Sequence, residues 1–257
     1  MEQPLRIVIV MSFLLFFTKI TSLMMVNYMY VKPFARASPC SAVQRPCLTL
    51  NEYANDSNEY FVNNTRFYFY PGIHRLKYSL LLVNLHNVSF LNWPNDDQAV
   101  TIAVDSSASI IWSKSWNIEI SSIRFTLYGN FTFIMRFKHS QIVRLSNISV
   151  YGNGYWGCSL IISEESVIEF NDSMFIGING VYGAALLIFA SNVTLIGSIL
   201  ANNTAASGGS IYLTDNSTLS LNRTSLFLNN TSSKEVMGRK ILSCNNINSM
   251  RKIKQLP

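Results

Sequence analysis

Charged residues, cysteines and histidines are all scarce in this chain of 257 residues. Lys, Arg, Asp and Glu together make up 13% of the sequence and hydrophobic residues make up 49%, which excludes a disordered polyelectrolyte. Four cysteines are too few to define a disulfide scaffold. Because the three histidines show no zinc-ligand spacing and there is no Cys-x-x-Cys pair, the sequence predicts no metal site.

The motifs that mark common enzyme classes are also missing. The chain has no Gly-x-Ser-x-Gly nucleophile, no Walker loop and no His-Glu-x-x-His zinc motif. The Gly-His-Gly, Asn-Thr-Asp and Arg-Ile-Lys patterns of galacturonan hydrolases are absent as well. We therefore predict no catalytic residue and no cofactor.

The formal net charge of +6 comes from the two ends of the chain. Between residues 20 and 233 the 12 basic residues are balanced by 12 acidic ones, whereas residues 234–257 hold six basic residues and one acidic residue. A nucleic-acid-binding protein needs its basic stripe on the folded body, where the stripe can neutralise phosphates. Nucleic acid is therefore not a predicted partner.

The N-terminus resembles a targeting segment. Arg6 precedes an apolar run at 7–17, which has the length of a signal-peptide core, and Ala35-Arg36-Ala37 offers a small-x-small cleavage site. Residues 7–31, read as one segment, are also long enough to span a bilayer. We predict that residues 1–37 are a cleaved signal peptide or an uncleaved signal-anchor built on a hydrophobic helix. Either would place the protein outside the cell or on the extracellular face of the plasma membrane, with no other membrane contact.

Asparagine usage agrees with that compartment. Asn-x-Ser/Thr sequons abound, and their predicted glycosylation sites are Asn55, Asn63, Asn87, Asn130, Asn147, Asn171, Asn192, Asn202, Asn216, Asn222 and Asn229. Asn230 also heads a sequon, but two adjacent asparagines are not expected to carry glycans together. Turn residues of a β-protein would also create sequons by chance. Cys40 and Cys47 flank a short loop and are the predicted disulfide, whereas the states of Cys158 and Cys244 stay open.

A repeat of about 25 residues organises the middle of the chain. An apolar-polar-apolar motif recurs at 88–90, 118–120, 143–145, 168–170, 193–195 and 219–221, with spacings of 30, 25, 25, 25 and 26 residues. A second apolar position follows five residues later, at Phe125, Val150, Phe175, Leu200 and Leu226, and a third register includes Leu160, Ala185 and Ser210. Period-2 alternation marks strands with one buried face. Three short strands per repeat leave no room for a crossover helix.

These features predict an all-β fold, a right-handed parallel β-helix of six to seven turns in which each strand pairs with its equivalent one turn away. The outward column is polar and would place Arg144 between Glu119 and Glu169, as an ion-paired row. An antiparallel sandwich shows the same alternation but needs no constant period. We assign 38–59 to an N-terminal cap or linker, 60–233 to the β-helix, and 234–257 to a disordered basic tail at a truncated end. The uncapped last turn would permit self-association.

One stretch carries a family resemblance. Residues 200–212 read Leu-Ala-Asn-Asn-Thr-Ala-Ala-Ser-Gly-Gly-Ser-Ile-Tyr and resemble the Asn-Asn-Thr-Ala…Gly-Gly-Ala-Ile repeat of polymorphic outer-membrane-type proteins and related extracellular invertebrate β-helix proteins. Ser210 stands where that repeat usually has Ala. The resemblance implies the pectin-lyase-like superfold over residues 60–233 and a role in surface display or adhesion.

These observations favour a non-enzymatic extracellular β-helix glycoprotein that serves in surface display, adhesion or recognition of a ligand that the sequence does not identify. Trp112, Trp116 and Trp156 fall near loops and are candidate ligand-binding residues, because aromatic rings stack on the apolar faces of sugars. Glycans or extracellular proteins are the predicted partners. The alternative is a polysaccharide lyase or hydrolase, or a degenerate relative, and its candidate acids are Asp96, Asp97, Glu164, Glu165, Glu169, Asp172 and Asp215.

Overall fold

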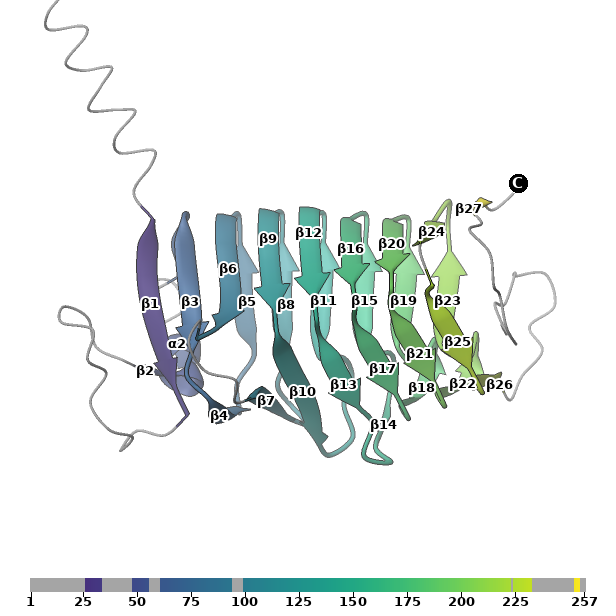
Figure 1. Ribbon diagram of the computed structural model, residues 1–257, viewed down its shortest axis with the longest axis horizontal. Coiled ribbons are helices and arrows are strands. Elements are labelled where there is room, and N and C mark those ends of the chain that lie inside the picture. Colours follow the sequence, from purple (N-terminus) through teal and green to yellow (C-terminus); the bar gives the residue numbers. More distant parts are fainter. Residues whose placement is uncertain are drawn as a thin grey trace, which may run out of the picture.

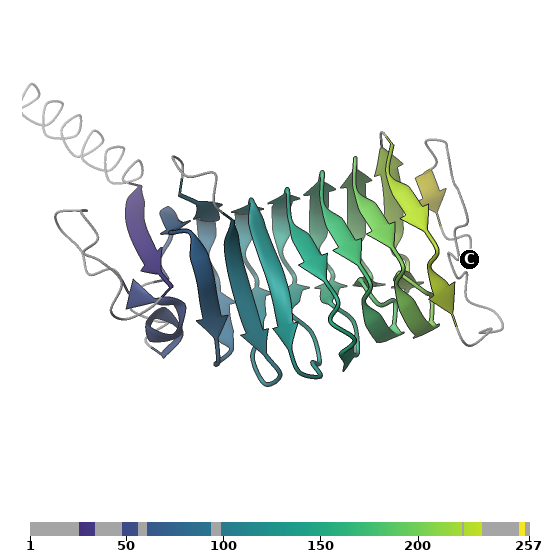
Figure 2. The same cartoon turned by 60° about the horizontal axis from the view of Figure 1, so that its bottom comes forward.

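The structure is a computed structural model that describes residues 26–33, 48–55, 61–93, 99–222, 224–232 and 252–254. Within these residues nearly every element is a β-strand, and the strands coil into a parallel solenoid of about six turns. The turns lie side by side along the long axis, from the purple N-terminal strand to the yellow C-terminal strands (Figures 1 and 2). The predicted all-β parallel coil is confirmed.

The strands form four sheets, which we name A to D. Sheet A contains β1 (Asn27–Lys32), β2 (Leu48–Thr49), β3 (Thr65–Phe69), β6 (His86–Asn92), β9 (Trp116–Ser121), β12 (Gln141–Ser146), β16 (Val167–Asn171), β20 (Asn192–Ile196), β24 (Thr218–Asn222) and β27 (Lys252–Lys254). Sheet B contains β4 (Gly72–Leu76), β7 (Val100–Asp105), β10 (Ile123–Tyr128), β13 (Ser149–Tyr151), β17 (Met174–Ile176), β21 (Ile199–Ala201) and β25 (Leu226–Leu228).

Sheets C and D complete each turn. Sheet C contains β5 (Leu80–Val83), β8 (Ile110–Ser113), β11 (Met135–Lys138), β15 (Ile161–Glu164), β19 (Leu186–Phe189) and β23 (Ile211–Thr214). Sheet D contains β14 (Trp156–Gly157), β18 (Asn179–Tyr182), β22 (Thr204–Ser207) and β26 (Thr231–Ser232). The prediction of three strands per turn is therefore wrong for the later turns, where short pairs such as Trp156 with Asn179 add a fourth strand.

The 25-residue repeat sets the register of sheet A. Arg144 pairs with Glu119 on one neighbouring strand and with Glu169 on the other, as predicted. Buried side chains alternate with these outward ones, because successive residues of a strand face opposite sides of the sheet. In sheet B the last turn departs from the prediction. Phe227, not Leu226, pairs with Leu200 and is buried, since the preceding corner is one residue longer.

Polar side chains inside the corners of the coil form hydrogen-bonded ladders. The Ser166 hydroxyl accepts a hydrogen bond from the Ser140 N–H at 2.9 Å, and the Ser191 hydroxyl accepts one from the Ser166 N–H at 2.9 Å. Two such serine columns consist of Ser115, Ser140, Ser166, Ser191 and Ser217, and of Ser173, Ser198 and Ser225. They satisfy backbone N–H groups that turn inward between sheets, where burial without a partner would destabilise the fold.

The N-terminal boundary of the solenoid differs from the prediction. Strand β1, at Asn27–Lys32, pairs in parallel with β3 over five residues, and Val31 is fully buried. The solenoid therefore begins within the segment assigned to the leader and not at residue 60. Residues 1–25, on which the predicted hydrophobic helix mainly falls, lie outside the described residues. Among those that are described, no helix is long and apolar enough to cross a membrane.

Helix α2 (Leu50–Asn55) packs against the N-terminal end of the core. The Thr49 N–H donates to the Glu52 carboxylate, and the Glu52 N–H donates to the Thr49 hydroxyl, which is a capping box. The bond from the Thr49 N–H lowers the pKa of Glu52. Leu50 and Tyr53 are buried, and the Tyr53 ring packs edge-on against Phe67 with centroids 5.5 Å apart. Part of the predicted cap region therefore covers the first turn.

The C-terminal end is not wholly uncapped in sheet A. Strand β27, at Lys252–Lys254, pairs antiparallel with β24 through Thr218, Leu219 and Ser220. The expectation that no part of the basic tail pairs with the solenoid is therefore wrong. Residues 233–251 lie outside the described residues, and self-association through the last turn stays a prediction.

A buried histidine makes stability depend on pH. His74 faces inward on β4, its Nε2 lies 2.6 Å from the Tyr70 carbonyl oxygen, and its ring packs edge-on against Phe69. In the described structure its Nδ1 has no hydrogen-bond partner, so the protonated ring would lack an acceptor there. Burial lowers the pKa of His74.

We expect the free energy of unfolding to fall as the pH drops below about 6.5, the ordinary histidine value. Above that pH both states are neutral. Below it the unfolded chain binds the proton first, and stability is lost down to the lowered pKa of the folded state. Urea unfolding between pH 5 and 7.5 measures this slope, and His74→Gln should flatten it. The half-buried His86, replaced in His86→Gln, is the control, and equal slopes in the native and H74Q proteins would contradict the assignment.

Candidate binding surface

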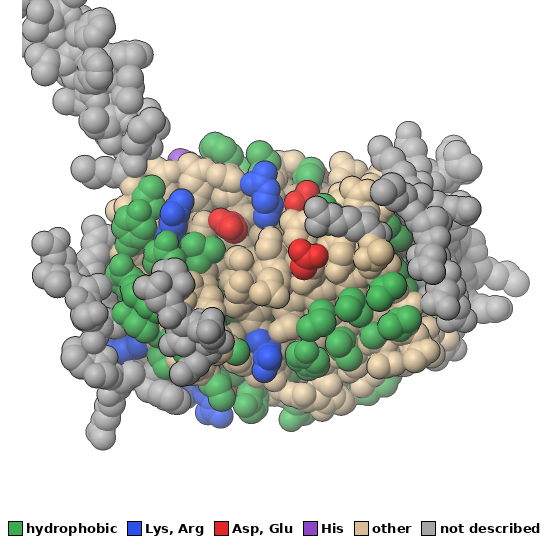
Figure 3. All heavy atoms as spheres, viewed as in Figure 1, with side chains coloured by type: hydrophobic (Ala, Val, Ile, Leu, Met, Phe, Trp, Pro, Cys, Tyr) green, Lys and Arg blue, Asp and Glu red, His purple; other side chains and the backbone are tan. Residues whose placement is uncertain are grey.

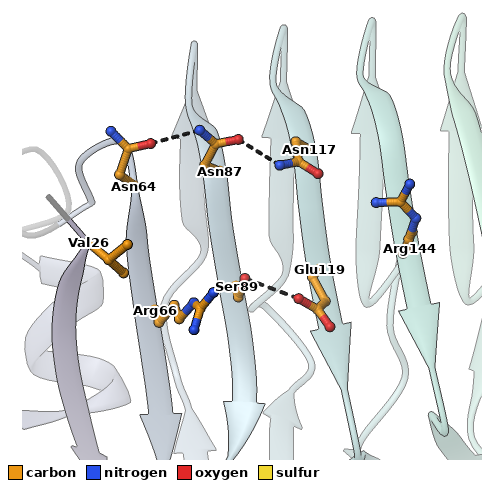
Figure 4. Close-up of a pocket in the computed structure, with 8 residues that line it drawn as sticks. All are labelled: Val26, Asn64, Arg66, Asn87, Ser89, Asn117, Glu119 and Arg144. Atoms are coloured by element: carbon orange, nitrogen blue, oxygen red, sulfur yellow. Dashed lines mark hydrogen bonds between the residues drawn. The ribbon is translucent and has the colours of Figure 1, made fainter. Parts of the chain in front are cut away.

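The outer face of sheet A is hollowed over its first turns. The hollow has a volume of about 420 Å³ and is lined by Val26, Asn64, Arg66, Asn87, Ser89, Asn117, Glu119 and Arg144 (Figure 4). All but Val26 are polar. Val26 and Asn64 directly precede β1 and β3, and the other six residues lie on β3, β6, β9 and β12. Parallel pairing of these strands brings together residues that lie far apart in sequence.

A ladder of three asparagines forms one side of the hollow. The Asn87 amide donates to Asn64 Oδ1 at 2.7 Å, and the Asn117 amide donates to Asn87 Oδ1 at 2.6 Å (Figure 4). All three residues have φ between 53° and 58°. Asparagine is enriched in this left-handed region because its short polar side chain bonds locally. The same backbone turn therefore selects asparagine in three successive turns and aligns their amides.

Three charged side chains also line the hollow. Arg66, Glu119 and Arg144 are exposed, and the Ser89 hydroxyl donates to the Glu119 carboxylate at 3.4 Å (Figure 4). Within the described residues, the ion pairs are Arg136 with Glu164 and His139 with Glu165. The predicted ion-paired row around Arg144 is thus in register but unpaired. Two guanidinium groups remain available to a ligand.

An aromatic cluster lies next to the hollow on the same sheet face. Its members are Tyr28, Tyr30 and Tyr68, which point outward from β1 and β3, and Tyr70 and Trp93, which directly follow β3 and β6. Tyr70 and Trp93 are stacked with centroids 4.9 Å apart and planes 15° apart. Burial raises the pKa of the Tyr70 hydroxyl, and the neighbouring Tyr30 adds to the effect. Figure 3 shows hydrophobic side chains gathered at this end and charged ones beside them.

Sequence reasoning missed this cluster for two reasons. Tyr28 and Tyr30 fall in the segment assigned to the leader, and Tyr68 and Tyr70 precede the first repeated motif at 88–90. The alternation at 65–70 was the available signal: Phe67 and Phe69 are buried, whereas Tyr68 and Tyr70 are only half-buried. A strand with large aromatics on both faces cannot bury both of them in one core.

The three predicted tryptophans do not form one site. Trp112 is fully buried and packs edge-on against Phe90, so its assignment to a surface loop is wrong. Its spacing places it inward on β8, in register with Leu82. Trp116 is 48% exposed and stacks on His86 beside the asparagine ladder, and Trp156 is 51% exposed on sheet D. Only Trp116 adjoins the hollow.

The candidate acids are dispersed over the coil. Glu164 pairs with Arg136 at 2.6 Å, and Glu165 pairs with His139 at 3.1 Å, both on the sheet C side. Glu169 accepts a hydrogen bond from Asn171, and Asp215 accepts one from Thr214. Asp172 is exposed at the corner after β16, and Asp96 and Asp97 lie outside the described residues. Glu119 is the carboxylate that lines the hollow, and no described cluster of three His, Cys, Asp or Glu side chains could hold a metal ion.

The sequons fall into two groups. In the first, the asparagine side chains are engaged by the fold, at Asn63, Asn87, Asn130, Asn147 and Asn171. In the second, the side chains are exposed and no described hydrogen bond involves their amides, at Asn192, Asn202, Asn216, Asn222 and Asn229. Asn55 ends α2, and its side chain lies outside the described residues. Asn230 is buried and donates to the Leu200 carbonyl, whereas its neighbour Asn229 faces solvent.

Of the four cysteines, Cys158 is the one that the structure describes. Cys40, Cys47 and Cys244 lie outside the described residues, so the predicted disulfide stays a prediction. Cys158 is half-buried with a free thiol, and burial raises the pKa of that thiol. A raised pKa reduces the thiolate fraction and hence its reactivity.

Comparisons with protein families, with curated proteins and with solved structures find no match for this chain.

Proposed function

We propose that this protein is a non-enzymatic extracellular β-helix glycoprotein that recognises glycans through the outer face of sheet A. The observation that carries the proposal is the aromatic cluster of Tyr28, Tyr30, Tyr68, Tyr70 and Trp93 beside a polar hollow on the same face of sheet A. Sugar rings have apolar faces that stack on aromatic rings and hydroxyl groups that bond to amides and charged side chains. The two surfaces together match both properties.

The remaining parts of the proposal rest on sequence patterns. The exposed asparagines at five sequons support N-glycosylation, and the apolar run at 7–17 supports secretion or anchoring at the plasma membrane. The resemblance of residues 200–212 to surface-displayed β-helix repeats supports a pectin-lyase-like coil and a role in display or adhesion. One departure from that repeat has a partner in the coil, because the Ser210 hydroxyl accepts a hydrogen bond from the Asn203 amide at 3.0 Å.

A glycan array followed by calorimetry on the strongest ligand tests the proposal. We expect Tyr70→Ala combined with Trp93→Ala to weaken binding about tenfold, because each lost stacking contact is worth about 0.5–1.5 kcal/mol. Trp156→Ala, on sheet D, is the matched control and should leave binding unchanged. Thermal melting of each variant checks that the fold is retained.

Two outcomes would contradict this assignment. If Trp156→Ala abolished binding and the double variant did not, the site would lie on sheet D. If the folded, glycosylated protein bound no glycan on the array, recognition of glycans would be excluded as its function.

A further inference from the structure

The charges in the hollow point to a narrower class of ligand. We propose that Arg66 and Arg144 each bind one anionic group of a linear acidic polysaccharide that lies along the solenoid axis, across the strands of sheet A. This inference rests on the proposed glycan-binding function and adds the charge and the orientation of the ligand. It is carried by two exposed guanidinium groups, neither of which forms an ion pair within the described structure.

The register fixes the spacing between the two arginines. Arg66 pairs with Ser89, Ser89 pairs with Glu119, and Glu119 pairs with Arg144. Adjacent strands are about 4.8 Å apart, so three steps separate the two arginine backbones by about 14 Å. Two anionic groups a few sugar units apart on one linear polymer can span such a distance. A single small anion that contacted both arginines would have to lie midway between them, next to the negative charge of Glu119.

The neighbouring groups suit a carbohydrate more than a protein or a nucleic acid. The asparagine ladder leaves the second amide hydrogens of Asn87 and Asn117 available for hydroxyl groups. Tyr68 lies two residues after Arg66 on the same outward face, so a ring of the polymer can stack beside the bound anion. The balanced charge of residues 20–233 gives no basic stripe of the kind that nucleic acid needs.

Removal of the Glu119 charge is expected to raise the affinity for an acidic polymer, whereas removal of either arginine is expected to lower it. The Glu119 carboxylate lines the hollow between the two arginines and repels an anionic ligand. Glu119→Gln keeps the shape of the side chain and an acceptor for the Ser89 hydroxyl. Removing that negative charge should therefore tighten the binding of an acidic polymer, about twofold to fivefold, and should leave a neutral polymer unaffected.

The experiment measures binding of three polysaccharides to the full-length protein: alginate, which carries carboxylates, heparin, which also carries sulfates, and the neutral glucan dextran. Arg66→Gln and Arg144→Gln should each weaken binding of the acidic polymers about tenfold. Arg124→Gln is the matched control, because Arg124 is also an exposed arginine but lies on sheet B, over the ring of Tyr151. It should change binding less than twofold. Comparison of alginate with heparin shows whether carboxylate or sulfate is preferred.

Several outcomes overturn the inference, and they can be told apart. Equal losses in R66Q and R124Q would mean non-specific attraction to surface charge. Weaker binding of acidic polymers by E119Q would contradict the placement of the anions. Binding of dextran without binding of either acidic polymer would leave the proposed function standing and exclude this inference. Binding of no polysaccharide and no array glycan would exclude both.

Discussion

A variant that lacks residues 1–37 is expected to melt at least about 6 °C below a variant that lacks only residues 1–25. The difference between the two variants is β1 and the residues that follow it. Met29 and Val31 are buried against the first turn, and burial of two such side chains contributes about 3–6 kcal/mol. One kcal/mol corresponds to about 2–4 °C for a domain of this size.

The loss should extend beyond two side chains. Strand β1 pairs with β3 at five positions, and the Tyr30 carbonyl accepts a hydrogen bond from the Tyr53 hydroxyl of α2 at 3.2 Å. Without β1, the edge of β3 exposes unpaired backbone groups next to an apolar core, which favours aggregation. Tyr28 and Tyr30 would also leave the aromatic cluster, so glycan binding should weaken together with stability.

Circular dichroism melting and size-exclusion chromatography of the two variants measure both effects. Equal melting temperatures would contradict the assignment of β1 to the solenoid.

Cleavage of the leader after Ala37 would remove β1 from the solenoid. If the protein is processed in a secretory host, we therefore expect its new N-terminus at or before Val26, and N-terminal sequencing that found Ser38 on a folded monomer would overturn this expectation.

The second large effect is expected from Asn203→Asp, which should destabilise the fold by about 3–5 kcal/mol at pH 7. Asn203 is fully buried, its Oδ1 accepts the Ile178 N–H at 2.9 Å, and its amide donates to the Phe175 carbonyl at 2.9 Å and to the Ser210 hydroxyl. Aspartate has the same size but no amide hydrogens. Its charge would be buried, and the Phe175 carbonyl would face a negative oxygen in place of a donor.

Asn202→Asp is the matched control because Asn202 is adjacent, exposed and in the left-handed region that aspartate also tolerates. Its effect should stay within about 0.5 kcal/mol. Burial raises the pKa of an unpaired carboxyl, so part of the lost stability of N203D should return as the pH falls and the group becomes neutral. Urea unfolding of unglycosylated protein at pH 7 and pH 4.5 measures both effects, and equal stability of N203D and N202D would contradict the role of the buried Asn203 hydrogen bonds.

The regular part of the fold was predictable because its information is local and periodic. From residue 118 onward the motif around Arg144 recurs at 25 or 26 residues, and alternation within it identifies the buried face without knowledge of any distant contact. The polar outward column, including Glu119 and Arg144, was found for the same reason. The serine ladders had a similar signal at Ser166 and Ser191, but side-chain hydrogen bonds to backbone at a corner do not follow from composition alone.

The errors occurred where the spacing is irregular. Asn27 and Thr65 are 38 positions apart, so the 25-residue period did not reveal that β1 pairs with β3. Trp112 was misplaced because it lies between the first two motifs, whose 30-residue spacing departs from the period, so its register in sheet C cannot be counted from a neighbouring repeat. Long insertions of this kind cost little free energy, so they leave no constraint on the sequence.

The sequence by itself therefore determined the coil, its period and the polarity of its faces, since a parallel strand that repeats in register must repeat its pattern of buried residues. Only the tertiary structure decided where the solenoid begins and which side chains meet on its outer face. Tyr30, Tyr68 and Trp93 lie 38 and 25 residues apart in the sequence, yet their rings pack together. Their proximity depends on the burial of distant side chains in one core, and no local pattern encodes it.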